Sequence, residues 1–273
     1  MSTDAAANTQ RGSAVGLMLY AHRGSSLLAP ENTLPAFELA LSYGADVLEI
    51  DVRLSRDGEV IVIHDERVDR TCNGHGRVRD LNLSAIKKLN AAHRFTGMEG
   101  QSHQFDDTPL ITLSELFEHL PQTSINIDIK DNSQQAAQAV ARAIEKANRV
   151  SSINVGSFHA QALAHFRDAL PQATTAATQS EVAQLYFKRS RYRSIPFEYL
   201  QIPLNYMGIP LATRSFITHA MQRGVKTVYW TINDKATMQQ LIERGVSGIV
   251  TDRVDIASAL LGRNIKHAAM AQQ

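Results

Sequence analysis

The chain has 273 residues, 44% of them hydrophobic, and a net charge of +1. This length suits one large domain or two small ones, and the balanced charge argues against nucleic-acid binding and against electrostatic attachment to a membrane. No apolar run reaches the roughly 18 residues of a spanning helix, so we expect no stable membrane insertion. The single cysteine, Cys72, excludes an intramolecular disulfide and a cysteine-based metal site.

Strand-like and helix-like patterns alternate along most of the chain. Strands are predicted near 17–21, 46–52, 60–64, 124–129, 152–157, 172–177, 198–202, 225–231 and 247–251, and helices near 33–43, 113–120, 133–147, 159–169, 213–223, 234–244 and 253–261. This alternation predicts an α/β fold with a parallel sheet and crossover helices. Periodicity alone does not distinguish a closed eight-stranded barrel, which typically needs about 250 residues, from an open doubly wound sheet.

Three segments depart from this alternation. The first sixteen residues are polar and alanine-rich, without the apolar stretch of a signal peptide. We therefore expect disordered tails at 1–16 and 263–273 around a domain at 17–262, and a cytoplasmic protein. The segment 65–109 contains the turn signal Asn73-Gly74 and polar stretches, which indicate an insertion after the second strand region.

His22 and Arg23 lie where the apolar run from Val15 to Tyr20 ends and a glycine begins. This position predicts the end of a buried strand. A neutral imidazole takes up or releases a proton near pH 7, and a guanidinium binds an oxyanion through two parallel hydrogen bonds. The pair therefore indicates an acid or base beside an anion clamp, which suits phosphate chemistry. Taken alone, a strand-end histidine beside a surface arginine remains the alternative.

Acidic side chains recur on one face of the predicted strands. Glu49 and Asp51 are two residues apart on the strand 46–52, and Asp128 and Lys130 share a face of the alternating run from Ile125 to Lys130. Carboxylates on one face repel one another unless a cation lies between them. A polar strand face turned to water is the alternative for the first pair. His64 ends the short predicted strand 60–64.

With these segments in order, the chain resembles the glycerophosphodiester phosphodiesterase family from about residue 17 to residue 261. The matching segments are His22-Arg23-Gly24, Glu31-Asn32-Thr33, Glu49-Ile50-Asp51, His64-Asp65, Asn126 to Lys130, Ser157-Phe158, Trp230 to Asn233 and Gly248 to Asp252. The resemblance implies a (β/α)8 TIM barrel, with 65–109 as an insertion that caps its mouth. In that architecture the strand ends share one rim, where the active site lies. One departure is Asp128, since the third acidic residue of the family is often glutamate.

The resemblance also implies a reaction and a set of roles. The reaction is the metal-dependent hydrolysis of a small-molecule glycerophosphodiester to sn-glycerol 3-phosphate and an alcohol. The implied catalytic acid and base are His22 and His64, the implied ligands of one divalent cation are Glu49, Asp51 and Asp128, and the implied substrate-binding residues are Arg23, Lys130, Trp230, Phe158, Glu31 and Asn32. Hard oxygen ligands favour Mg²⁺ or Ca²⁺, with Mn²⁺ as a third choice, over zinc.

Several alternatives stay open at this point. Glu31 and Asn32 either line the site or brace Arg23 and cap the next helix, and Trp230 is either a pocket wall or a core aromatic. The sequence does not decide which histidine is the acid, whether water or the substrate's glycerol hydroxyl attacks, or whether the protein forms a homo-oligomer. A lysophospholipase D-type phosphodiesterase is the alternative function. A lipid substrate would need an exposed apolar lip or an amphipathic helix at the barrel mouth. This alternative ranks second because 65–109 has no long aromatic-rich or basic stretch.

Overall fold

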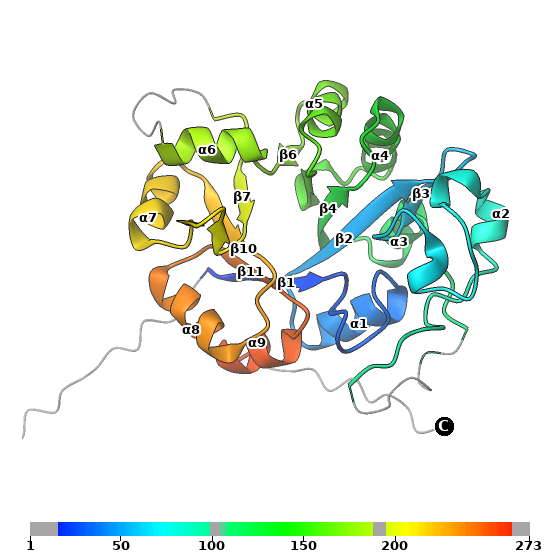
Figure 1. The fold of residues 1–273 in the computed structure, drawn as a ribbon, viewed down its shortest axis with the longest axis horizontal. Coiled ribbons are helices and arrows are strands. Elements are labelled where there is room, and N and C mark those ends of the chain that lie inside the picture. Colours follow the sequence, from blue (N-terminus) through cyan, green and yellow to red (C-terminus); the bar gives the residue numbers. More distant parts are fainter. Residues whose placement is uncertain (1–15, 99–104, 106, 188–194, 264–273) are drawn as a thin grey trace, which may run out of the picture.

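The computed structural model describes residues 16–98, 105, 107–187 and 195–263. The two predicted tails therefore lie almost entirely outside the described residues. Figure 1 shows helices arranged around a central ring of strands. The parallel strands of this ring are β1 (Met18–His22), β2 (Val47–Leu54), β4 (Ser124–Ile129), β5 (Ile153–Gly156), β6 (Thr174–Thr175), β7 (Tyr199–Ile202), β10 (Lys226–Tyr229) and β11 (Gly248–Thr251).

These strands form a nearly closed barrel. They follow one another in space in the order β6-β5-β4-β2-β1-β11-β10-β7. A single parallel bridge from Ala176 to Tyr199 connects the two ends of this order. The predicted TIM barrel is thus confirmed, and the open doubly wound sheet is excluded.

Helices surround the ring of strands, and several of them begin with a side chain that caps the helix N-terminus. The helices are α1 (Leu34–Ser42), α3 (Leu113–His119), α4 (Gln134–Lys146), α5 (Ala160–Ala169), α6 (Gln179–Phe187), α7 (Arg214–Gln222), α8 (Lys235–Arg244) and α9 (Val254–Leu260). The side chains of Thr33, Thr112 and Ser133 each accept a hydrogen bond from the first turn of the helix that follows. Such caps satisfy backbone donors that have no partner within the helix.

The alternation along each strand separates two environments. On β2, Leu48 and Ile50 are fully buried in the large hydrophobic core that contains residues of the surrounding helices. Their neighbours Glu49 and Asp51 point to the opposite, inner face of the strand. The inside of the barrel holds a smaller apolar cluster of Tyr20, Val47, Val228 and Val250. Polar side chains therefore stand above an apolar floor, at the carboxyl ends of the strands.

The insertion after β2 has its own structure. β3 (Val60–Val62) runs antiparallel to β2, so it is an excursion of the connection, and β4 is the next barrel strand. Short helices follow at η1 (Val68–Arg70), η2 (Val78–Asp80) and α2 (Leu83–Ile86). A separate small hydrophobic cluster, which includes Val68, Cys72, Val78 and Ile86, holds this segment together. The capping function of 65–109 stays a prediction.

Outside the insertion, α6 and one hairpin were not predicted from the sequence. α6 follows Thr178, whose backbone N–H donates to Glu181 while its hydroxyl accepts from the backbone of Glu181. The hairpin consists of β8 (Asn205–Tyr206) and β9 (Ile209–Pro210), whose two-residue strands are too short to show alternation. In the described part of the chain, no helix is long and apolar enough to cross a membrane.

Candidate active site

One cavity of about 350 Å³ opens at the carboxyl ends of the barrel strands. Of the site residues predicted from the sequence, the cavity is lined by His22, Arg23, Glu49, Asp51, His64, Asp128, Lys130, Phe158 and Trp230. The strand ends thus bring together side chains that are up to two hundred positions apart in the sequence, as the barrel requires. Glu31 and Asn32 are not among the lining residues.

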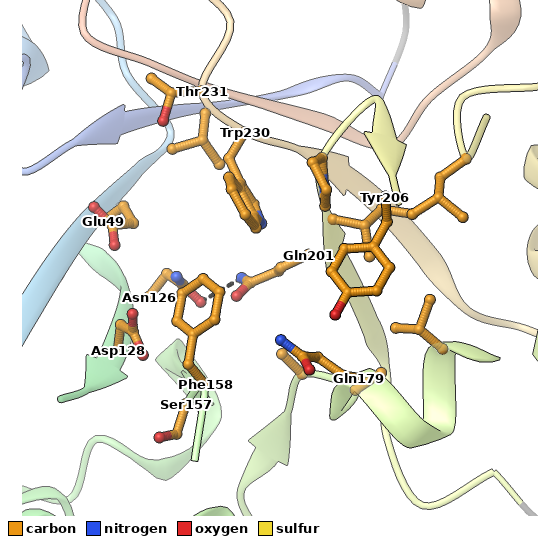
Figure 2. A pocket seen from close by; sticks show the side chains of 18 of the residues that line it. Glu49, Asn126, Asp128, Ser157, Phe158, Gln179, Gln201, Tyr206, Trp230 and Thr231 are labelled. Carbon is orange, nitrogen blue, oxygen red and sulfur yellow. Dashed lines mark hydrogen bonds between the residues drawn. The ribbon is translucent and has the colours of Figure 1, made fainter. Parts of the chain in front are cut away.

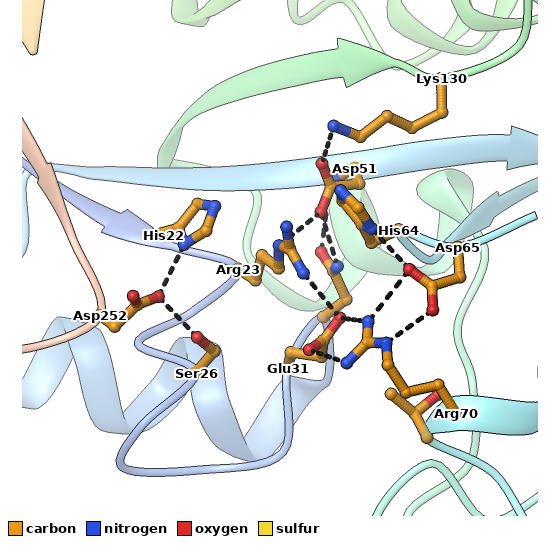
Figure 3. Close-up of polar contacts among 12 residues, drawn as sticks. His22, Arg23, Ser26, Glu31, Asp51, His64, Asp65, Arg70, Lys130 and Asp252 are labelled. Carbon is orange, nitrogen blue, oxygen red and sulfur yellow. Dashed lines mark hydrogen bonds and ion pairs between the residues drawn. The ribbon is translucent and has the colours of Figure 1, made fainter. Parts of the chain in front are cut away.

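A carboxylate forms a hydrogen bond with the His22 ring nitrogen Nδ1 (Figure 3). This nitrogen lies 2.6 Å from Oδ1 of Asp252. Ser26 also donates to Oδ1 of Asp252, and Asn233 donates to Oδ2. Burial raises the pKa of Asp252, but the hydrogen bond and charge of His22, together with the hydrogen bonds from Ser26 and Asn233, outweigh it and lower this pKa to about 2. An ionised carboxylate only accepts hydrogen bonds, so Nδ1 carries a proton. Nε2 of His22, 4.0 Å from Oε2 of Glu49, is left to exchange protons in the cavity.

His64 is held in the same way from the other side of the site. Its Nδ1 lies 2.7 Å from Oδ1 of Asp65. The environments of the two histidines differ. Burial lowers the pKa of His22, yet the hydrogen bond to Asp252 and the charge of Glu49 bring it above 6.5. Burial also lowers the pKa of His64, and the charges of Arg23 and Lys130 keep it below 6.5. The pair therefore divides into a more basic and a less basic imidazole.

Two cations lie among the acidic side chains. Nζ of Lys130 is 2.9 Å from Oδ1 of Asp51 and 2.5 Å from Oδ2 of Asp128. Nε of Arg23 is 3.1 Å from Oδ2 of Asp51, and its backbone N–H donates to Glu49 over 3.0 Å. Asp51 is thus neutralised from both sides, whereas Oδ1 of Asp128 is buried and accepts no hydrogen bond.

The pKa values of the three carboxylates follow from this arrangement. Burial and the charge of Asp51 raise the pKa of Glu49 to about 7. Burial likewise raises the pKa of Asp128. Burial acts in the same direction on Asp51, but the charges of Lys130 and Arg23 are stronger, and the pKa of Asp51 is lowered. Of the three carboxylates, only Asp51 is close enough to both cations for its pKa to fall below the usual value.

The three carboxylates have the donor type that a hard divalent cation prefers, but their oxygen atoms do not converge on one point. Glu49, Asp51 and Asp128 offer only oxygen atoms, and the unpartnered Oδ1 of Asp128 is a free acceptor. Among the described residues, however, no three histidine, cysteine or acidic side chains converge closely enough to form a ready metal site. Lys130 occupies the space between Asp51 and Asp128 instead.

Glu31 belongs to a layer of ion pairs behind the cavity (Figure 3). Its carboxylate accepts from Arg23 at 3.1 Å and from Arg70 at 2.7 and 2.8 Å. Arg70 also donates to Asp65 at 2.6 Å, and Asp65 holds His64. One guanidinium from the insertion therefore connects the supports of Arg23 and His64. These contacts favour the bracing interpretation of Glu31.

Asn32 braces the site as well. Its side chain donates to Oδ2 of Asp51 at 3.0 Å and accepts from the backbone N–H of Asp51. It is not the helix cap, because Thr33 has that position. The sequence analysis assigned no role to Asp252 or Arg70. A role for Asp252 could have been predicted, since this acidic residue directly follows a barrel strand. For Arg70, no local pattern shows that it folds back onto Glu31.

The far side of the cavity is aromatic and amide-rich (Figure 2). Trp230 and Phe158 pack edge to face, with ring centroids 5.7 Å apart. Between them and the barrel floor, the amides of Gln201 and Asn154 both donate to the side-chain oxygen of Asn126 at 2.6 Å. Trp230 is therefore a pocket wall and not a core aromatic.

Comparison with known proteins agrees with this geometry. The model of the glycerophosphoryl diester phosphodiesterase family matches residues 22–256, which include every residue that holds His22 and His64. The chain belongs to this family. The resemblance inferred from the sequence is thereby confirmed, and with it the enzyme class, a phosphoric diester hydrolase.

Relatives of this phosphodiesterase family match over most of their length. The chain is 32% identical over 244 residues to a glycerophosphodiester phosphodiesterase of Caldanaerobacter subterraneus, covering 86% of this chain and 93% of the relative. It is 32% identical over 251 residues to one of Bacillus altitudinis, covering 88% and 96%. The crystal structure of a glycerophosphodiester phosphodiesterase from Agrobacterium tumefaciens superposes with a TM-score of 0.74 at 27% identity, covering 89% and 99%.

Proposed function

We propose that the protein hydrolyses glycerophosphodiesters to sn-glycerol 3-phosphate and an alcohol, with His22 and His64 as the proton-transfer pair. The observation that carries this proposal is the two imidazoles in one cavity, each held through Nδ1 by its own carboxylate. Such a carboxylate fixes the ring and its tautomer, so the other nitrogen faces the reacting atoms. The membership of the chain in the family supports the same reaction.

The chemistry needs two proton transfers. An oxygen nucleophile loses its proton to one imidazole as its bond to phosphorus forms, and the bond between phosphorus and the leaving alcohol breaks. The other imidazole gives that alcohol its proton. Because the pKa of His22 is raised and that of His64 is lowered, the site holds one ring that binds a proton readily and one that gives it up readily.

Positive charge compensates the phosphate. Arg23 and Lys130 line the cavity and bring fixed cations to the non-bridging phosphate oxygens. Glu49, Asp51 and Asp128 would hold one divalent cation once Lys130 has turned from the carboxylates to the substrate. When bound, this cation would neutralise charge that develops on the phosphate, as a Lewis acid. Mg²⁺ and Ca²⁺ suit the oxygen donors, and Mn²⁺ is the third choice.

The proposed function is tested by an activity screen with and without added divalent metal. Purified protein is incubated with glycerophosphocholine, glycerophosphoethanolamine and glycerophosphoglycerol, and the release of glycerol 3-phosphate is followed. Metal-dependent release from these diesters is the expected result. If the protein cleaves none of them in any metal, the proposed function is wrong.

Asp252 is expected to act through His22. Replacing Asp252 with asparagine keeps the shape but removes the charge that orients the imidazole and stabilises its protonated form. We expect kcat to fall at least about tenfold, with a smaller change in KM. The matched control is Asp255→Asn, three residues further on, where the carboxylate pairs with Arg253 outside the cavity. Equal kinetics for the two variants would remove Asp252 from the mechanism.

We expect the phosphate and its small polyol to be recognised and the polar head group to vary. The cations and Trp230 converge on the phosphate end of the cavity, where the Trp230 ring can pack on the glycerol carbons. No described residue of the insertion 65–109 lines the cavity. The mouth lies between α6 and the β8–β9 hairpin instead.

This expectation gives a quantitative test. The three head groups should differ by about tenfold or less in kcat/KM, a ratio worth about 1.4 kcal/mol. Trp230→Ala should lower kcat/KM for all three by a similar factor. A thousandfold preference for one head group, or an effect of Trp230→Ala on only one diester, would contradict it.

A further inference from the structure

Arg70 binds two carboxylates at once, those of Glu31 and Asp65 (Figure 3). Its Nη1 and Nη2 donate to the two oxygens of Glu31 at 2.8 and 2.7 Å. Its Nε donates to Oδ2 of Asp65 at 2.6 Å, and its Nη2 also donates to Oδ1 of Asp65 at 3.2 Å. All three nitrogens of the guanidinium are therefore engaged, and both carboxylates are held through both of their oxygens.

Each of these carboxylates also holds a side chain that the proposed reaction uses. Oδ1 of Asp65 lies 2.7 Å from Nδ1 of His64, and Oε1 of Glu31 accepts a hydrogen bond from Nη1 of Arg23 at 3.1 Å. His64 and Arg23 line the catalytic cavity, whereas the carboxylates and the guanidinium behind them do not. Arg70 therefore acts on the reaction only through other residues.

The three groups of this ion-pair layer come from different parts of the chain. Glu31 precedes α1, Asp65 follows β3, and Arg70 ends η1 of the insertion. Burial raises the pKa of Asp65, but the hydrogen bonds from Arg70 and His64 outweigh it and lower this pKa to about 2. Burial also raises the pKa of Glu31, and the hydrogen bonds and charges of the two arginines lower it overall. Both carboxylates are thus ionised near neutral pH, which makes their hydrogen bonds with Arg70 strong.

The support of His22 is built differently. Asp252 is fixed by the neutral side chains of Ser26 and Asn233, and its side chain is 13% exposed. The side chain of Asp65 is 31% exposed, and the guanidinium that fixes it comes from the insertion. The orientation of His64 therefore depends on the insertion, whereas that of His22 depends on the barrel alone.

We propose that Arg70 is a positioning residue of the phosphodiester reaction, which keeps Glu31 and Asp65 at a fixed separation and so aligns Arg23 with His64. The proposal rests on the proposed function and assigns a role in the same site. A planar guanidinium suits this role because it can bind two carboxylates in a fixed geometry, which an ammonium group cannot. A misplacement of about 1 Å in a catalytic group costs on the order of a hundredfold in rate.

The competing interpretation is that Arg70 only anchors the insertion to the barrel. Kinetics of Arg70→Ala with a glycerophosphodiester and divalent metal are the first test. We expect kcat to fall at least about tenfold through His64, and KM to rise through Arg23. The matched control is Arg67→Ala, since Arg67 lies on the same segment, is 52% exposed against 49% for Arg70, and pairs with Asp69. Equal kinetics for the two variants would overturn the proposal.

The two arms of Arg70 should separate in kcat and KM. Asp65→Asn should lower kcat with little change in KM, and Glu31→Gln should mainly raise KM. When Arg70→Ala is added to Asp65→Asn, its effect on kcat should be at least about threefold smaller than in the wild-type protein, because the same path is already broken. Fully additive effects of these two substitutions would contradict the proposal.

Chemical rescue distinguishes positioning from anchoring. A second cavity, of about 270 Å³, is lined by both Glu31 and Arg70, so a guanidinium ion can enter the space that Arg70→Ala leaves. Millimolar guanidinium chloride should raise kcat of Arg70→Ala at least about threefold over the same concentration of sodium chloride, and should leave Arg67→Ala unchanged. An equal response of the two variants, or no response in Arg70→Ala, would overturn the proposal.

A spectroscopic readout needs no substrate and separates this proposal from the proposed function. Two-bond ¹H–¹⁵N spectra at alkaline pH, where both imidazoles are neutral, show which ring nitrogen carries the proton. In the wild-type protein His22 and His64 should both carry it on Nδ1, facing their carboxylates. Arg70→Ala should convert His64 to a mixture of tautomers and leave His22 unchanged. An unchanged His64 overturns the proposal even in an active enzyme, whereas this conversion in a protein that cleaves no diester refutes the proposed function alone.

Discussion

Replacing either histidine of the site with alanine is expected to lower kcat by at least about a hundredfold, the contribution of one proton-transfer partner. His22→Ala removes the imidazole that Asp252 holds, and His64→Ala removes the one that Asp65 holds. Both side chains reach the cavity from the ends of strands, so the hydrophobic core is left intact. The measurement is steady-state kinetics on a glycerophosphodiester, with circular dichroism and the melting temperature as the check on folding.

His93 supplies the control for this comparison. It is exposed, and it does not line the cavity. His93→Ala should keep wild-type kinetics. Near wild-type turnover in His22→Ala or His64→Ala would mean that the residue concerned has been misassigned, while loss in both with intact folding supports the proposed pair.

Removal of divalent metal is expected to lower activity at least as much as replacement of either histidine. Exhaustive treatment with EDTA should lower activity at least about a hundredfold, since a Lewis acid contributes several kcal/mol to catalysis at a phosphate. Mg²⁺, Ca²⁺ or Mn²⁺ should restore it. Asp128→Asn, which removes a charge next to the unpartnered buried oxygen, should weaken metal binding measured by calorimetry on the protein without substrate.

The control for the metal experiment is a carboxylate outside the site. Asp255→Asn should bind metal as the wild type does, because Asp255 pairs with Arg253. Full activity after EDTA treatment, with no metal detected by elemental analysis, would contradict the role of the cation. Among the described residues that line the cavity, Lys130 and Arg23 would then supply the fixed positive charge for the phosphate.

The residues proposed for proton transfer and metal binding could be identified from the sequence because strand geometry is local. Glu49 and Asp51 share a face in any strand, and His22 had to stand at a strand end before a glycine. The barrel itself did not follow from periodicity, since the same alternation suits an open sheet. Closure depends on a single bridge between Ala176 and Tyr199, which no local pattern reports.

The ion pairs behind the cavity and the cavity walls on α6 and the β8–β9 hairpin were harder to predict. Arg70 contacts Glu31 and Asp65 only because the insertion folds back toward the barrel. The apolar lip that a lipid substrate needs was sought in 65–109, whereas the structure has apolar walls on α6 and the hairpin. α6 did carry a readable signal, since Thr178-Gln179-Ser180-Glu181 has the spacing of a capping box.

The central claim is that this site breaks the bond between phosphorus and the head-group alcohol of a glycerophosphodiester. ³¹P nuclear magnetic resonance of a reaction with glycerophosphocholine, run with Mg²⁺ or Ca²⁺, identifies the phosphorus product directly. The account predicts that glycerol 3-phosphate accumulates as the diester signal disappears, and that His22→Ala leaves the diester intact over the same time. Accumulation of phosphocholine, which requires cleavage on the glycerol side, or an unchanged diester signal with the wild-type protein, would contradict it.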